Sequence, residues 1–131
     1  MKQCIDKYNL EDRTAVFGEN IIDLCREIAQ TPITRPLINQ IMRSGTSIGA
    51  NYCEANNASS KKDFKNKIFI CKKETQETKY WLRMLVKSEP DKRDDIAILW
   101  KECQELVMIF QKIINTCNGK TESPAIENLD N

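Results

Sequence analysis

Hydrophobic residues recur at spacings of three and four along most of the chain, which is the period of an amphipathic α-helix. The first such run lies within residues 10–30 and puts four apolar residues on one face: Phe17, Ile21, Leu24 and Ile28. It stops at Thr31-Pro32, because proline cannot continue the hydrogen-bond ladder of a helix. The pattern therefore predicts a first helix over about residues 10–30.

A second run predicts a helix over about residues 35–57, with Thr34 as its N-cap. Its apolar stripe consists of Leu37, Ile41, Gly45, Ile48, Tyr52 and Ala55. Each glycine inside a helix costs about 1 kcal/mol relative to alanine. We expect Gly45 and Gly49 to be kept because a neighbouring helix packs closely there; a bend in the helix is the alternative.

The third predicted helix covers about residues 60–87, since Ser60 and Asp63 resemble a capping box. Its main stripe follows the seven-residue repeat of bundle helices: Phe64, Ile68, Cys71, Thr75, Thr78, Leu82 and Leu85. A second, narrower stripe consists of Ile70, Trp81 and Met84. This second stripe predicts a further helix neighbour, either in the same chain or in another subunit.

The fourth predicted helix covers about residues 91–117, with Asp91 as N-cap and Asn118-Gly119 as the stop signal. Its stripe is Ile96, Leu99, Cys103, Leu106, Phe110, Ile113 and Cys117. Four helices with short connections predict an all-α fold, an antiparallel up-down-up-down four-helix bundle over residues 1–118. Residues 119–131 are acidic and aperiodic, so we expect a disordered tail.

Charge is nearly balanced over the 131 residues, with a formal net charge of +1. Its distribution is uneven, because residues 61–87 hold nine basic and three acidic residues. These side chains are candidates for contacting nucleic-acid phosphates: Lys61, Lys62, Lys65, Lys72, Lys73, Lys79 and Arg83. On composition alone, an ordinary solvated helix balanced by the acidic fourth helix is the simpler interpretation.

Six cysteines are present, but no pair is spaced Cys-x-x-Cys and the chain has no His. A zinc site or a His-based nucleophile set therefore cannot be assembled. Cys25, Cys71 and Cys103 fall on apolar stripes, which favours buried free thiols in a cytoplasmic protein. We also expect no cofactor and no metal, and no apolar run reaches the roughly 20 residues of a membrane span.

Several polar residues lie on the two central helices where a bundle would otherwise be apolar. They are Arg43, Asn51, Glu54, Glu74 and Glu77. Glu74 and Glu77 are three residues apart and share a helix face. With Arg43 nearby, an interhelical ion-pair network is the favoured interpretation, and a catalytic or metal site is the alternative.

Three segments together resemble a known family: RSGTSIGANYCEA at residues 43–55, KKDFKNKI at 61–68 and KETQETKYWLRML at 73–85. The resemblance is to the bacterial four-helix-bundle proteins encoded in intervening sequences of the 23S rRNA gene, and it covers about residues 10–115. It implies an antiparallel four-helix bundle, often a ring-like homopentamer. The family includes the accessory protein of diversity-generating retroelements, which partners a reverse transcriptase and binds nucleic acid through a basic surface.

The sequence leads to two hypotheses of function. The first is a non-enzymatic, homo-oligomeric bundle, with a pentamer favoured, that associates with rRNA or another nucleic acid through its basic third helix. The second is a protein-interaction scaffold, such as the accessory partner of a retroelement reverse transcriptase. An enzyme or metal protein is the third class, and the lack of His disfavours it.

Overall fold

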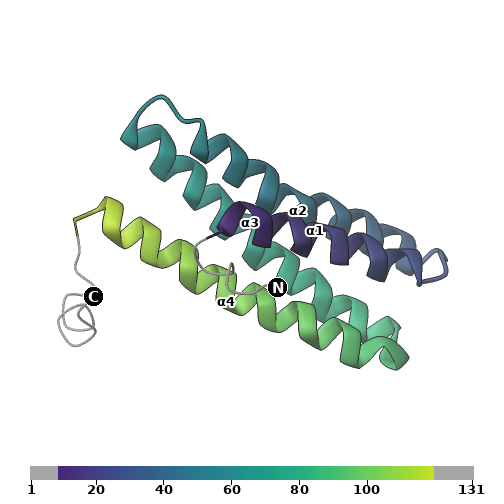
Figure 1. The fold of residues 1–131 in the computed structure, drawn as a ribbon. Coiled ribbons are helices and arrows are strands. Elements are labelled where there is room, and N and C mark those ends of the chain that lie inside the picture. Colours follow the sequence, from purple (N-terminus) through teal and green to yellow (C-terminus); the bar gives the residue numbers. More distant parts are fainter. Residues whose placement is uncertain (1–8, 120–131) are drawn as a thin grey trace, which may run out of the picture.

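The computed structural model describes residues 9–119, which form four α-helices in sequence order (Figure 1). These are α1 (Leu10–Arg26), α2 (Thr34–Asn56), α3 (Lys61–Ser88) and α4 (Arg93–Cys117), with a 3₁₀ turn, η2 (Pro90–Lys92), before α4. Each helix packs against the next in the chain, and α1 also touches α4. The predicted all-α up-down bundle is confirmed.

The core forms where the apolar stripes of the four helices meet. Its largest fully buried side chains include Phe17, Ile21, Ile41, Ile48, Ile68, Leu82, Leu85, Leu106 and Phe110. The predicted stripe of α4 fails at its end, where Ile114 is buried, Ile113 is half-buried and Cys117 is exposed. A strict seven-residue repeat drifts by about 20° per heptad on a straight helix, so the buried position moves by one residue.

The first helix is shorter than expected, ending at Arg26 rather than near residue 30. Thr34 is also not an N-cap but the first residue of α2. Its hydroxyl donates to the Ala29 carbonyl (2.7 Å), while Thr31 Oγ1 accepts from the amides of Ile33 and Thr34 (3.2 and 3.0 Å). Ile33 occupies the N-cap position without a side-chain cap bond, and the hydroxyl of Thr31 accepts from the first amides of α2 in place of the predicted Thr34 cap.

Of the two N-caps predicted for the later helices, one is correct and one is wrong. Ser60 caps α3, as expected, by accepting from the Asp63 amide at 3.0 Å. Asp91 is not the N-cap of α4, because Pro90 starts a 3₁₀ turn and α4 begins only at Arg93. Gly119 follows α4 with φ of 80°, the left-handed conformation that favours glycine.

Two glycines of α2 allow α1 to approach closely, as the sequence predicted. A Cβ at Gly45 would lie 3.0 Å from Ile21 Cγ1, and one at Gly49 would lie 3.2 Å from Thr14 Oγ1. Both separations are shorter than normal van der Waals contact. Close packing, and not a bend, is the reason for these glycines.

Residues 120–131, nearly all of the disordered tail expected over 119–131, lie outside the described residues, as do residues 1–8. Across residues 9–119, none of the helices combines the length and apolar character that crossing a bilayer requires.

Candidate functional site

The basic residues of α3 gather along one side of the helix. Lys61, Lys65, Lys72, Lys79 and Arg83 follow one another at spacings of 4, 7, 7 and 4. Those spacings are close to whole turns at 3.6 residues per turn, so the five residues share a face. Lys62 and Lys73 lie further round the same side. We call these seven residues the cationic face.

Contacts to α4 show which neighbour the cationic face borders. Lys65 Nζ donates to Asn118 Oδ1 (2.7 Å), and Lys72 Nζ donates to Gln111 Oε1 (2.6 Å). The Lys79 ammonium lies 4.6 Å from the ring centroid of Trp100, a cation–π contact. The face therefore follows the α3–α4 boundary, and its three partners, Gln111 and Trp100 on α4 and Asn118 at the C-cap of α4, are uncharged.

None of the seven cations forms an ion pair with another residue of the described range 9–119. Lys67 is the contrasting case on α3, because it points toward α2 and pairs with Glu54 at 2.7 Å. This pair raises the pKa of Lys67, first through the hydrogen bond to Glu54. The positive charge of the cationic face is thus not neutralised by its helix neighbours.

The acidic residues of α4 that form ion pairs are turned toward α1 instead. Arg13 reaches Glu102 at 2.7 Å and Glu105 at 2.8 Å. The hydrogen bonding of the Arg13 guanidinium to Glu102, which accepts, is the main cause that raises the pKa of Arg13. The bundle therefore separates its charge, with carboxylates on the α1 side of α4 and unpaired cations on the α3 side.

Two exposed aromatic side chains lie among the cations. Phe69 is 44% exposed and Tyr80 is 53% exposed, and both fall on the same side of α3 as Lys62 and Lys73. Sequence reasoning missed them, although their separation of 11 residues, about three helical turns, was a usable signal. An open hollow lies at the start of the face, lined partly by Lys61, Lys62 and Phe64.

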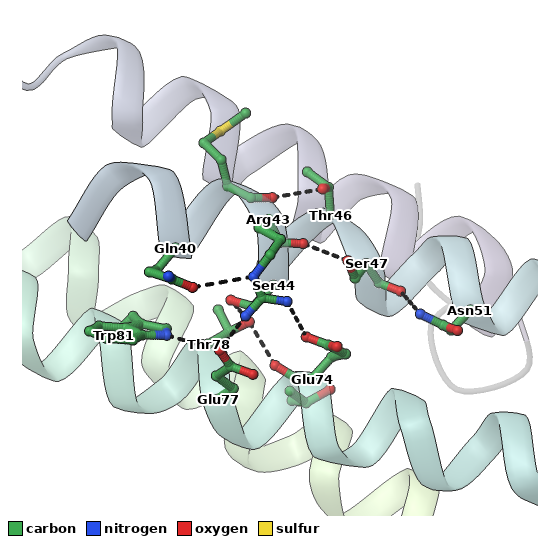
Figure 2. Close-up of polar contacts among 12 residues, drawn as sticks. Gln40, Arg43, Ser44, Thr46, Ser47, Asn51, Glu74, Glu77, Thr78 and Trp81 are labelled. Atoms are coloured by element: carbon green, nitrogen blue, oxygen red, sulfur yellow. Dashed lines mark hydrogen bonds and ion pairs between the residues drawn. The ribbon is translucent and has the colours of Figure 1, made fainter. Parts of the chain in front are cut away.

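The predicted polar network forms only in part, between α2 and α3 (Figure 2). Arg43 bridges Glu74 (3.2 Å) and Glu77, and Trp81 Nε1 donates to Glu77 at 3.2 Å. The Arg43 side chain is 46% exposed, Glu77 34% and Glu74 12%. The cluster therefore lies at the rim of the helix interface, not in the core where the sequence placed it.

Asn51 and Glu54 do not join this cluster, which corrects the five-residue prediction. Asn51 Nδ2 donates to the Ser47 carbonyl one turn earlier, at 2.8 Å, and Glu54 pairs with Lys67. The buried polar contact between the two helices is instead made by hydroxyls, since Thr78 Oγ1 lies 2.8 Å from Ser44 Oγ. Sequence reasoning missed this Ser–Thr contact.

Three of the five cysteines within residues 9–119 are buried in the core. Cys25, Cys71 and Cys103 are buried free thiols, as predicted. Burial raises the pKa of Cys25 to about 11 and those of Cys71 and Cys103 to about 12, so they stay protonated near neutral pH. In the part of the chain that the structure covers, no three His, Cys, Asp or Glu residues gather into a metal-binding group.

The central residue of the second apolar stripe, Trp81, packs within the same chain. Trp81 is partly buried, packs against the core and contacts the Tyr80 ring edge-on at 5.1 Å between centroids. Ile70 and Met84 are half-exposed. The largest exposures among big apolar residues occur elsewhere, at Ile33 (66%), Ile98 (67%) and Met108 (67%).

Comparison with known proteins finds a matching family and a similar solved structure. The model of a family described as "23S rRNA-intervening sequence protein" matches residues 7–112. A crystal structure from Bacteroides thetaiotaomicron, described as a protein of unknown function from the S23 ribosomal protein family, is 35% identical. It superposes with a TM-score of 0.71, and the match covers 79% of this chain and 96% of that one. No curated protein matches the chain.

Proposed function

The chain belongs to the 23S rRNA-intervening sequence protein family, and we propose that this member is a non-enzymatic protein that associates with RNA through the cationic face of α3. The observation that carries the proposal is a set of seven cations without an ion pair in residues 9–119, while Arg13, Lys67 and Lys92 all have carboxylate partners. An unneutralised row of this kind attracts a polyanion.

The length of the row favours a polymer over a small anion. From Lys61 to Arg83 the helix rises by roughly 33 Å at 1.5 Å per residue. A single phosphate or carboxylate would contact only one end of such a row, whereas a nucleic-acid backbone offers a phosphate to each cation. The net charge of +1 adds little attraction of its own, so we expect binding that depends on this one face and is weakened by salt.

The exposed aromatic rings favour single-stranded RNA over duplex. Bases of an RNA loop or single strand can stack on aromatic side chains, whereas paired bases cannot. Phe69 and Tyr80 are available for this, since each ring is close to half exposed beside the cations. RNA loops are therefore the partner class that best fits this surface.

The test is charge reversal with a matched control. Lys61→Glu/Lys62→Glu removes two cations from the first turn of α3, where acidic residues suit the helix dipole, so the fold should not suffer. Arg26→Glu/Arg35→Glu makes the same change of net charge near the α1–α2 connection, at the other end of the bundle (Figure 1). Binding should fall at least tenfold in the first variant and little in the second. Equal losses in the two variants would refute the assignment of this face.

We propose no catalytic role, because the chain has no His and the Arg43 cluster pairs its charges with one another. A scaffold function is the second candidate, supported by the exposure of Ile98 and Met108 on α4. Apolar side chains so exposed favour contact with another subunit or protein. Homo-oligomers would be detected by light scattering, and a reverse-transcriptase partner by co-purification; a monomer that captures neither would exclude this candidate.

A further inference from the structure

A groove between α3 and α4 continues the cationic face at the end remote from Lys61. It has a volume of about 370 Å³, at the low end of the roughly 300–1,000 Å³ typical of ligand pockets. Its walls are mainly apolar and include Val86, Ala97 and Trp100, all of which are half-exposed. This is an apolar recess bordered by the cationic face.

Three exposed cations surround this recess: Arg83 from α3, and Arg93 and Lys101 from α4. Within the described part of the chain none of the three has an ion-pair partner. Arg83 belongs both to the cationic face and to the groove. The backbone of a single RNA strand that follows the face could therefore continue into the groove. The groove thus combines an apolar floor with a rim that suits phosphate.

The Trp100 indole at the floor is partly buried and packs against the core. Lys79 lies over the Trp100 ring, with its ammonium 4.6 Å from the ring centroid. A fixed aromatic wall loses little conformational freedom on binding, which favours a flat apolar partner. A nucleobase is flat and has an apolar face, and its own phosphates lie within reach of cations at the rim.

We propose that the groove takes one unpaired base of a bound RNA strand, with the neighbouring phosphates held by Arg83, Arg93 and Lys101. This inference rests on the proposed function and adds to it a defined subsite. It adds a base contact beside Trp100 to the stacking that Phe69 and Tyr80 offer along the cationic face. The groove should therefore discriminate between strands of equal charge that differ only in having bases.

The experiment compares two fluorescent ten-residue RNA strands, a decauridylate and an abasic strand of the same length, by anisotropy. The natural protein should bind the decauridylate roughly tenfold more tightly, the order expected for stacking of one base. Ala97→Leu fills the groove without changing charge, and it should lower this ratio while leaving the affinity for the abasic strand unchanged. Ala50→Leu, the same substitution on an exposed position of α2, should leave both affinities unchanged.

A second readout does not depend on the filled groove folding normally. In a Trp81→Phe variant the sole tryptophan of the chain is Trp100. Its emission should be quenched by the decauridylate and not by the abasic strand. Equal quenching by the two strands would overturn the base subsite.

The possible outcomes separate this inference from the proposed function. If the natural protein binds the two strands equally, with steep salt dependence, the subsite is wrong and RNA association stands. If neither strand binds at low salt, both proposals fail. If light scattering shows that Ala97→Leu alone lowers the mass of the assembly, with the strand ratio unchanged, the groove belongs to a second copy of the chain and the subsite is overturned.

Discussion

The glycines at the α1–α2 contact allow a sharp test of the packing. Gly18 in α1 and Gly49 in α2 both lie inside helices, so replacing either with alanine gains about 1 kcal/mol of helix propensity. The surroundings of the added methyl group differ. At Gly18 the nearest atom would be Thr46 Cα at 3.8 Å, which is ordinary contact, whereas at Gly49 it would be Thr14 Oγ1 at 3.2 Å.

The contact at Gly49 includes backbone as well as side chain. The carbonyl oxygen of Thr14 would lie 3.3 Å from the new Cβ, so relief requires α1 and α2 to move apart. Overpacking of this kind costs about 1–3 kcal/mol. Gly18→Ala should therefore stabilise the protein by about 1 kcal/mol, whereas Gly49→Ala should destabilise it by about 1 kcal/mol after its propensity gain is subtracted.

Urea unfolding followed by circular dichroism measures both changes, provided that the m-value is the same in the two variants. In thermal unfolding, 1 kcal/mol corresponds to a shift of about 4 °C for a domain of this size. Gly18→Ala should raise the midpoint and Gly49→Ala should lower it. Equal stabilisation by the two substitutions would refute the close approach of α1 to α2 at Gly49.

Four further predictions concern charges and thiols. Arg13→Ala should cost about 2 kcal/mol in urea unfolding, because it leaves the partly buried Glu102 without its partner where α1 meets α4; a cost below about 0.5 kcal/mol would contradict this. Glu77→Ala should cost about 1 kcal/mol, since it removes one of the two carboxylate partners of Arg43 and the acceptor of the Trp81 indole, whereas Glu54→Ala at an exposed pair should cost less. In a Cys4→Ser background, a thiol reagent at pH 8 should modify only the exposed cysteines, Cys53 and Cys117, until the protein unfolds. Stability should also fall as pH rises from about 9 to 11, because the unfolded chain releases thiol protons that folded Cys25, Cys71 and Cys103 retain; a flat profile over this range would count against their burial.

The helices and the core could be predicted because burial on a helix leaves a periodic signal in the sequence. Phe17, Ile21 and Ile48 lie where the spacing of apolar residues placed them. Helix ends were less predictable, since they depend on which amide each nearby hydroxyl reaches. Thr31 and Thr34 are both good capping residues and both hydroxyls accept from amides. Thr31 Oγ1 accepts from Ile33 and Thr34 at the start of α2, whereas Thr34 Oγ1 accepts from Thr31 before the helix.

The positive charge of the candidate site could be predicted from the sequence, but the residues that contact its side chains could not. The excess of lysine in α3 is evident from the sequence, as is the possibility that Arg43 meets Glu74 and Glu77. The sequence cannot show that Lys67 turns toward Glu54, or that Trp100 lies under Lys79, because both depend on how α3 is rotated against its neighbours. The α3–α4 groove arises from the same rotation, so no local pattern revealed it.

The central claim is that unpaired cations on α3 bind RNA phosphates, and a salt series tests it most directly. The affinity for a single-stranded RNA of about ten nucleotides would be measured by anisotropy from low to near-physiological salt. If most of the seven cations contact phosphates, log K should fall against log salt with a slope of roughly −3 to −5, at about 0.7 per contact. Binding with a slope near zero, or no binding at low salt, would contradict the account.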